Sequence, residues 1–357
     1  MTENQKKELD LLLNDMAQQN TLYRPTNFWQ EASKIIIDEI EEYGLKNFRA
    51  LQSSMNMFAP VYGYHDYIED KSRFESVKSA LQEVTTDLKS NIKLDLLFSG
   101  QTQAFADYRV LKATNKNYPP FTDKVSESKV GSPKEHHTFD GRNFSRSFLN
   151  YLLGLNFLKQ HIENPEIHTV MEIGGGFGTL GEILLSDERN NCFYINADIP
   201  PVSFISSYYL KEVFGAKNIA DYKELREYNS LDIVELKQKY KALNIPSWQV
   251  PKLKGEIDLF VNFISFQEME PNVVKNYCDY VTALNPKYIL LRNIEEGKKK
   301  KDENTIYGVE KPILGSDYDN FFPDYKLIAT DGSVFGFKTE DDFHSQLRLY
   351  IKADKNL

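Results

Sequence analysis

The sequence has 357 residues, of which 41% are hydrophobic and 27% are charged, so it is expected to fold around a substantial core rather than to be disordered. Its formal net charge of -9 argues against a nucleic-acid backbone or an anionic membrane surface as the main partner. No window approaches the roughly 20 apolar residues of a membrane span. Cys192 and Cys278 lack the spacing of a disulfide framework or a zinc site, so we assign no metal. We therefore expect a cytoplasmic protein with small-molecule partners.

Residues 1–142 are expected to form a helical region, followed by a second unit over residues 143–357. The clearest helix spans residues 25–44, where Pro25 and Thr26 favour a start and Gly44 a stop. Its apolar residues recur at three- and four-residue steps, which favours core packing or a dimer contact over a ligand site. Residues 114–142 hold three prolines and two glycines, which indicates a long connecting loop, and such loops are often functional.

From residue 143 onward the pattern alternates between helices and strands, which indicates an α/β fold with a parallel sheet. A helix is expected over residues 143–162, and later helices begin near residues 179, 203 and 271. The expected strands are residues 168–173, 192–199, 217–222, 256–264 and 287–294. Residues 325–332 and 345–352 follow each other without an obvious helix, so they are expected to pair as an antiparallel hairpin at the sheet edge.

The segment MEIGGGFGTLGEILL, residues 171–185, carries a glycine-rich loop that can be read in two registers. Residues 172–178 match an adenosylmethionine loop, whereas residues 176–181 spell the dinucleotide pattern GxGxxG. The first glycine of either loop must follow the strand end, and Ile173 is the last strand-like residue. This favours the first register, in which Glu172 can hold the cationic amino group of a methionine moiety.

Asp198 ends the next strand and is placed to accept two ribose hydroxyls, which suits either cofactor. By fold analogy, Asp221 is a candidate acceptor for an adenine amino group, although a role in a turn explains it equally well. The predicted cofactor-binding residues are Glu172, Gly174, Gly175, Gly176, Phe177, Gly178, Asp198, Ile199, Asp221 and Asn262.

Three segments together resemble the sugar O-methyltransferases of bacterial polysaccharide loci: residues 172–178, Asp198-Ile-Pro200 followed by residues 207–210, and Ser265-Phe-Gln-Glu-Met269. The resemblance covers about residues 130–352. It implies a Rossmann-like, seven-stranded methyltransferase sheet with an antiparallel last strand. It also implies transfer of a methyl group from S-adenosylmethionine to the hydroxyl of a sugar, either nucleotide-linked or phosphorylated or part of a surface polysaccharide precursor such as capsule. The helical N-terminal region is then expected to build the acceptor pocket or a homodimer interface.

Residues that follow the last two parallel strands should face the substrate, and Ser265, Arg292 and Asn293 meet this condition. The segment also resembles plant-type small-molecule O-methyltransferases, but Gln267 and Glu268 stand where their catalytic histidine and aspartate would be.

Because glutamine is a poor proton acceptor, the general base should be Glu268 or come from another segment, with His136 and His137 of the long loop as the outside candidates. Two alternatives stay open, namely an NAD-dependent oxidoreductase that uses residues 176–181, and a non-catalytic cofactor-binding scaffold.

Overall fold

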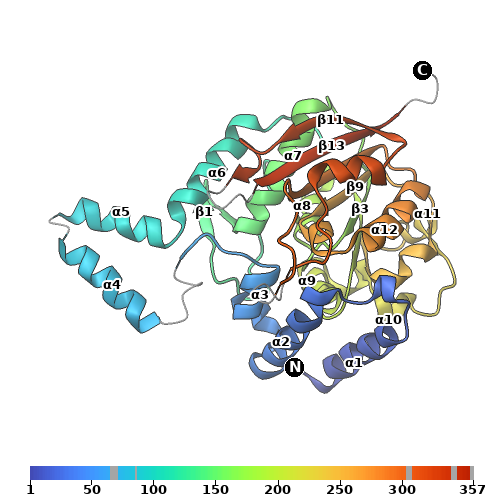
Figure 1. Ribbon diagram of the computed structural model, residues 1–357, viewed down its shortest axis with the longest axis horizontal. Helices are drawn as coiled ribbons and strands as arrows, with labels where there is room; N and C mark the ends of the chain where they lie inside the picture. Colours follow the sequence, from blue (N-terminus) through green and yellow to red (C-terminus); the bar gives the residue numbers. More distant parts are fainter. Residues whose placement is uncertain (65–70, 85–86, 303–307, 339–343, 354–357) are drawn as a thin grey trace.

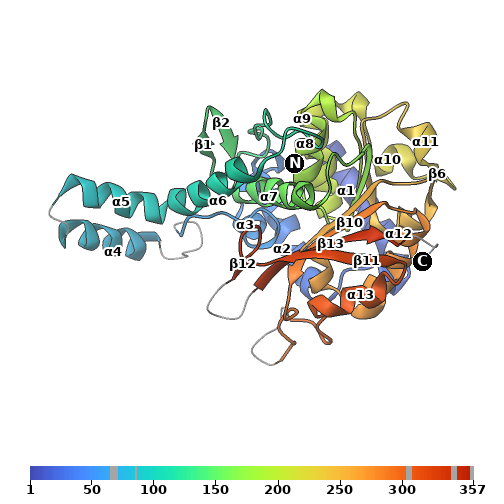
Figure 2. The ribbon, with the colours of Figure 1, turned by 90° about the horizontal axis from the view of Figure 1, so that it is seen from above.

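The centre of the protein is a mostly parallel β-sheet with helices on both faces (Figures 1 and 2). The computed structural model describes residues 1–64, 71–84, 87–302, 308–338 and 344–353. Eight strands lie side by side in the order β5, β7, β4, β3, β9, β10, β13, β11, and a ninth, β12, pairs with β13. The strands are β3 (Thr169–Ile173), β4 (Phe193–Asp198), β5 (Ile219–Ala220), β7 (Ala242–Pro246), β9 (Leu259–Phe263), β10 (Tyr288–Ile294), β11 (Tyr325–Asp331), β12 (Phe337–Lys338) and β13 (His344–Lys352).

The α/β fold class is confirmed, including the reversed last strand. β13 lies between β10 and β11 and runs antiparallel to both, with Leu290 opposite Leu349 in the first of these pairings. The expected number of seven strands is wrong, because the unanticipated β7 pairs with β4 and β5 then pairs with β7 at the edge. Short strands β6 (Leu231–Asp232) and β8 (Leu253–Lys254) form a separate pair.

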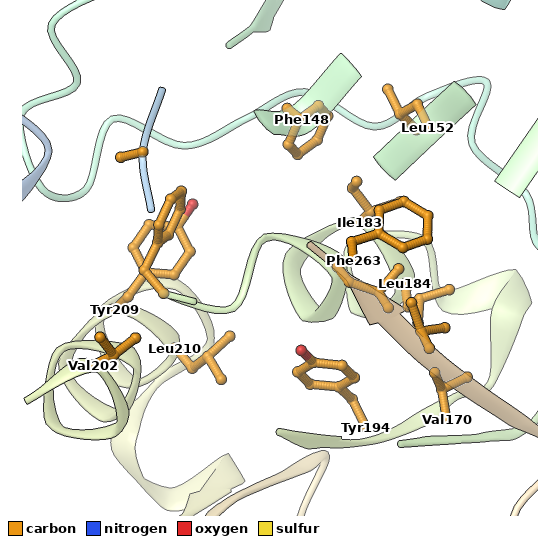
Figure 3. Close-up of a cluster of buried hydrophobic side chains, with 14 of the residues drawn as sticks. Phe148, Leu152, Val170, Ile183, Leu184, Tyr194, Val202, Tyr209, Leu210 and Phe263 are labelled. Atoms are coloured by element: carbon orange, nitrogen blue, oxygen red, sulfur yellow. The ribbon is translucent and has the colours of Figure 1, made fainter. Parts of the chain in front are cut away.

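Helices cover the two faces of the sheet and bury its apolar side chains in two clusters. One face is covered by α7 (Arg146–His161), α8 (Thr179–Leu185) and α9 (Val202–Phe214). Figure 3 shows Phe148 and Leu152 of α7 above Ile183 of α8, with Val170 and Tyr194 of the sheet below them. The other face is covered by α10 (Tyr222–Leu225), α11 (Ile233–Leu236), α12 (Pro271–Ala283) and α13 (Tyr318–Phe321).

The N-terminal region is helical, as expected, and shares its core with the sheet face that carries α7. Its helices are α1 (Glu3–Ala17), α2 (Asn27–Tyr43), α3 (Gln52–Met57), α4 (Lys71–Val84), α5 (Leu88–Phe98) and α6 (Gln101–Thr114). The predicted helix over residues 25–44 is α2, and Gly44 ends it with a φ angle of +87°. None of the helices in the described part of the chain combines the length and the apolar character that a membrane span requires.

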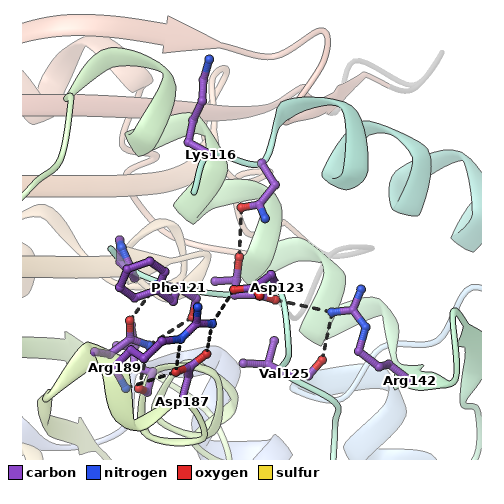
Figure 4. Close-up of polar contacts among 12 residues, drawn as sticks. Lys116, Phe121, Asp123, Val125, Arg142, Asp187 and Arg189 are labelled. Carbon is purple, nitrogen blue, oxygen red and sulfur yellow. Dashed lines mark hydrogen bonds and ion pairs between the residues drawn. The ribbon is translucent and has the colours of Figure 1, made fainter. Parts of the chain in front are cut away.

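The predicted long loop runs from the end of α6 to a small hairpin of β1 (His137–Phe139) and β2 (Arg142–Phe144). It is fastened to the body near α8, as Figure 4 shows. The Arg189 guanidinium donates to Asp123 at 2.5 Å and lies over the Phe121 ring, 4.3 Å from its centre. The same guanidinium is bound to the buried Asp187, so a surface ion pair with Asp123 joins this part of the loop to the body.

Candidate active site

The glycine-rich loop joins β3 to α8 and begins at Gly174. Gly174, Gly176 and Gly178 have φ angles of +69°, +58° and +98°, a conformation that other residues rarely adopt. A Cβ atom on Gly174 would lie 2.0 Å from the Ser265 Oγ, so this position has no room for a side chain. The turn therefore starts directly after Ile173, as the adenosylmethionine register requires.

Gly181, the last glycine of the GxGxxG pattern, lies within α8. A Cβ atom there would lie 2.5 Å from the Tyr194 ring, so the glycine allows α8 to pack closely on β4. The third glycine of a dinucleotide loop has the same task. The two registers are therefore distinguished by the end of β3 and not by Gly181.

A cavity opens at the carboxyl ends of β3, β4, β9 and β10, where open parallel sheets bind ligands. The space free of protein atoms within and in front of it amounts to about 1120 Å³, open solvent included. Nine predicted site residues line it: Gly174, Gly175, Gly176, Phe177, Asp198, Ile199, Ser265, Glu268 and Arg292.

Asp198 fixes the glycine loop from the end of β4. Its Oδ2 accepts the backbone N–H of Gly176 at 3.0 Å, and its Oδ1 accepts the N–H of Ile199 at 2.7 Å. Burial raises the pKa of Asp198 to about 7, although both hydrogen bonds oppose that shift. A carboxylate has about four lone-pair positions, so this one retains acceptor capacity toward the cavity.

Glu172 lies under the loop and is not part of the cavity wall. Its side chain is fully buried, and its two oxygens accept hydrogen bonds from the hydroxyls of Tyr151 at 2.7 Å and Tyr194 at 2.6 Å. Burial raises the pKa of Glu172 to about 7. Tyr151 does line the cavity, so Glu172 contacts a ligand site through this tyrosine rather than directly.

Four predicted residues, Asn262, Ser265, Gln267 and Asn293, form a buried polar network at the carboxyl ends of β9 and β10, and of these only Ser265 lines the cavity. The Asn262 Nδ2 donates to the Ser265 Oγ at 2.6 Å, and the Asn262 Oδ1 accepts from the Asn293 Nδ2 at 3.2 Å. The Gln267 backbone N–H donates to the Asn293 Oδ1 at 3.3 Å, while the Gln267 side chain accepts the N–H of Ile294 at 2.7 Å. Asn262, Asn293 and Gln267 thus position the loop that carries Ser265.

Arg292 contributes a buried cation to the cavity wall. It is 1% exposed, its Nε donates to the Ser345 Oγ at 2.8 Å, and an η-nitrogen donates to the carbonyl of Asn150 at 3.3 Å. Burial lowers the pKa of Arg292 to about 10, so the guanidinium stays charged at neutral pH. Its carbonyl accepts the N–H of Ile264 at 2.6 Å, which holds that cavity residue at a φ angle of +75°. Such strain in a β-branched residue is characteristic of functional sites.

Glu268 lies in the 3-10 helix η7 (Ser265–Glu268) and joins three segments at the cavity. The Trp29 indole N–H donates to its Oε2 at 3.0 Å, and the Lys298 ammonium donates to its Oε1 at 2.9 Å. The Thr26 hydroxyl donates to the backbone carbonyl of Glu268 at 2.9 Å. The start of α2 is therefore held against the sheet at this residue.

Neither predicted histidine lines the cavity. The His136 Nε2 lies 3.3 Å from the Glu127 carboxylate, which is fully buried and also accepts from Arg49 at 2.5 Å. The His137 ring contacts Gln101 at 2.8 Å and Glu135 at 3.2 Å. Both imidazoles therefore take part in contacts that fasten the long loop to the N-terminal helices.

Asp221 is also outside the cavity, because β7 and not β5 is the neighbour of β4. Its carboxylate accepts the N–H of Lys223 at 3.1 Å at the start of α10 and pairs with the Lys211 ammonium at 2.7 Å. The cavity residue that follows the strand next to β4 is Ser247. The turn role considered for Asp221 matches these contacts.

Sequence reasoning did not identify the cavity residues that the helical region and α7 supply. They include polar, apolar and aromatic side chains from the segment at the start of α2, from α3 and the residues just after it, and from α7. The set is Arg24, Thr26, Trp29, Met57, Phe58, Pro60, Ser147, Asn150 and Tyr151. No motif marks them, because they reach the cavity only through tertiary packing.

Comparisons with known proteins concern the overall structure. Neither a protein-family model nor a curated protein matches the sequence. Several similar solved structures are methyltransferases. The magnesium protoporphyrin IX methyltransferase of Synechocystis PCC 6803, solved with bound S-adenosylhomocysteine, is 10% identical with a TM-score of 0.37, over 70% of this chain and 94% of that one. The Burkholderia thailandensis 1,6-didemethyltoxoflavin-N1-methyltransferase, also solved with S-adenosylhomocysteine, is 12% identical with a TM-score of 0.37, over 57% and 79%.

Proposed function

We propose that this chain is an S-adenosylmethionine-dependent O-methyltransferase that acts on a sugar hydroxyl in the cytoplasm. One observation carries the proposal. The glycine loop after β3 and Asp198 at the end of β4 meet on the wall of one large cavity, in a sheet whose last strand is antiparallel. The turn at Gly174 favours this cofactor over NAD, because the dinucleotide register would begin two residues later.

The residues present fit the cofactor. Asp198 retains acceptor positions for two ribose hydroxyls, and its neighbours on the wall include the apolar side chains of Ile199 and Val202 for an adenine ring. Arg292 supplies a buried cation for a carboxylate, and Ser265 a hydroxyl beside the loop. When bound, the cofactor supplies an electrophilic methyl group, and the protein must hold the acceptor oxygen in line with it.

The helical region and α7 supply the acceptor side of the cavity. Trp29 and Phe58 offer aromatic faces for a sugar ring, and Ser147 and Asn150 of α7 offer polar groups beside them. Fixing the acceptor in this way accounts for much of the expected acceleration, because well-oriented groups reach effective molarities of about 10⁵–10⁸ M. Glu268 is the predicted base that lies on the wall, so we assign it the hydroxyl proton.

Calorimetry tests the cofactor. S-adenosylhomocysteine should bind the wild-type protein, and Asp198→Ala should weaken binding by roughly 10–100-fold, since hydrogen bonds to charged groups contribute about 1.5–3 kcal/mol. Asp221→Ala is the matched control, because this aspartate follows a strand of the same sheet but lies outside the cavity. Binding of NAD without S-adenosylhomocysteine would overturn the proposal.

Methyl transfer tests the acceptor. Purified protein with labelled S-adenosylmethionine should label at least one member of a panel of nucleotide sugars, sugar phosphates and polysaccharide precursors. Glu268→Gln should lose most of that turnover and still bind the cofactor. Tight cofactor binding with no transfer to any member of the panel would favour the scaffold alternative and contradict the enzymatic assignment.

A further inference from the structure

α4 and α5 form a helical hairpin that projects away from the body of the protein (Figures 1 and 2). We call residues 71–84 and 87–98 the arm. The Phe74 and Phe98 rings meet edge to face with their centres 5.3 Å apart, and the Lys78 ammonium lies 3.0 Å from the Asp95 carboxylate. Phe74 is the buried residue of α4, and α5 has none. The two helices thus bury very little against each other.

The arm instead exposes large apolar side chains along both helices. On α4, Phe74 is followed by apolar residues at positions 77, 81 and 84, which is the alternating three- and four-residue spacing of a coiled-coil seam. The exposed fractions are Val77 52%, Leu81 40%, Val84 76%, Leu88 77%, Ile92 49%, Leu96 40% and Leu97 42%. Large exposed apolar side chains gathered on one projecting element are typical of an interaction site.

The arm also needs a partner for its own stability. α4 has 14 residues and α5 has 11, and isolated helices shorter than about 12–15 residues are marginal in water. Two-helix hairpins become stable when their apolar seams meet those of two further helices, as in a four-helix bundle. We propose that the arm of one chain packs against the arm of a second copy, so that the protein is a dimer held by a four-helix bundle.

The charges of the arm favour a second copy over other partners. Its described residues carry five Lys or Arg and four Asp or Glu side chains, whereas the whole chain has a net charge of -9. A nearly neutral surface neither attracts an anionic membrane or nucleic acid nor repels its own copy.

The charges are also unevenly placed along the arm. The start of α4, at the base of the arm, carries Lys71 and Arg73 against Glu75, whereas the end of α4 and the start of α5, at its tip, carry Glu83 and Asp87 against Lys89. In a two-fold interface each contact occurs twice, once from each copy. If the two arms pack antiparallel, the acidic excess at the tip of each arm lies against the basic excess at the base of the other.

Sedimentation velocity and light scattering on the full chain test this inference, which does not depend on the proposed function. The wild-type protein should have a mass near twice 41.4 kDa and dissociate on dilution. Leu81→Glu and Ile92→Glu should each give a monomer that keeps the cooperative unfolding of the body and loses only the helical signal of the arm from its circular dichroism spectrum. Val234→Glu is the matched control, because this valine is 52% exposed on α11 of the body, and it should stay dimeric.

Two further variants test the orientation. Glu83→Arg should weaken the dimer by about 2–5-fold, as expected for an exposed charge pair, and combining it with Lys71→Glu should restore the affinity. A wild-type protein that is monomeric up to its solubility limit would overturn the inference. So would a dimer that survives both Leu81→Glu and Ile92→Glu, since another surface would then hold the copies together.

Discussion

Replacing Glu172 by glutamine should change how the stability of the protein depends on pH. The Glu172 carboxyl is fully buried, and burial raises its pKa from 4.5 to about 7. An acid with a raised folded-state pKa stabilises the fold while it is protonated, so its contribution is complete below pH 4.5 and is lost as the pH rises through 7. At about 1.4 kcal/mol per pKa unit, the wild-type protein should lose about 3 kcal/mol across this interval from Glu172 alone.

Glutamine has no charge to gain, so Glu172→Gln should lack this loss. Near pH 5 the variant should be less stable than wild type by about 1–3 kcal/mol, because its amide N–H₂ faces the hydroxyl of Tyr151 or Tyr194 and leaves a buried donor unsatisfied. Near pH 8 the two proteins should be similar in stability, because the wild type then carries a buried charge. Glu182 and Asp198 also have pKa values raised to about 7 by burial, but they titrate in both proteins.

Urea unfolding at about pH 5 and pH 8 measures the difference. Glu227→Gln is the matched control, because this side chain is 87% exposed, and it should follow the wild-type pH dependence. The reasoning is refuted if Glu172→Gln loses as much free energy of unfolding as the wild type does between the two pH values.

Two other variants probe the loop and the N-terminal contacts. Gly174→Ala should abolish S-adenosylhomocysteine binding by calorimetry, because its Cβ would lie 2.0 Å from the Ser265 Oγ, whereas Gly141→Ala, at a similar φ of +74° but in open space, should bind normally. Arg49→Met should lower the free energy of unfolding by about 3–5 kcal/mol in urea, since it leaves the buried Glu127 carboxylate without its ion-pair partner. A second substitution, Glu127→Gln, should recover part of that loss, and an equally unstable double variant would contradict the ion-pair explanation.

Local features of the sequence were enough to predict most of the fold. The strand before the glycine loop, the turn at Gly174 and the end of α2 at Gly44 depend on neighbouring residues, so their pattern is visible without tertiary structure. The order of strands beyond β4 is not local. Residues 219–220 and 242–246 both form strands on that side of the sheet, and only packing decides that β7 pairs with β4 while β5 takes the edge. Asp221 therefore follows an edge strand, outside the cavity.

The candidate site was predictable where the backbone sets the role of a residue and unpredictable where a distant partner sets it. Glu172 was correctly placed at the end of β3. The direction in which its side chain points depends on the hydroxyls of Tyr151 of α7 and Tyr194 of β4, which donate to its carboxylate. In the sequence, His136 looks like a solvated loop histidine. Its ring nevertheless contacts the buried carboxylate of Glu127, which is paired with Arg49 of the N-terminal region. Tyr151 and Tyr194 are 21 and 22 residues from Glu172, and Arg49 is 87 residues from His136, so no spacing rule connects them.

The position of Glu268 was predictable from the sequence, whereas its contacts were not. Its place after β9 follows from the sheet, but its neighbours Trp29 and Lys298 lie more than 200 residues apart in the chain. The contacts take two of the roughly four lone-pair positions of the carboxylate, so a hydroxyl in the cavity can still bind to it. Because one of the two contacts comes from α2, the helical region fixes the orientation of the proposed base as well as shaping the acceptor side. Loss of the indole donor in Trp29→Phe should therefore reduce turnover more than cofactor binding, and equal losses in both would mean that Trp29 only supports the fold of the cavity.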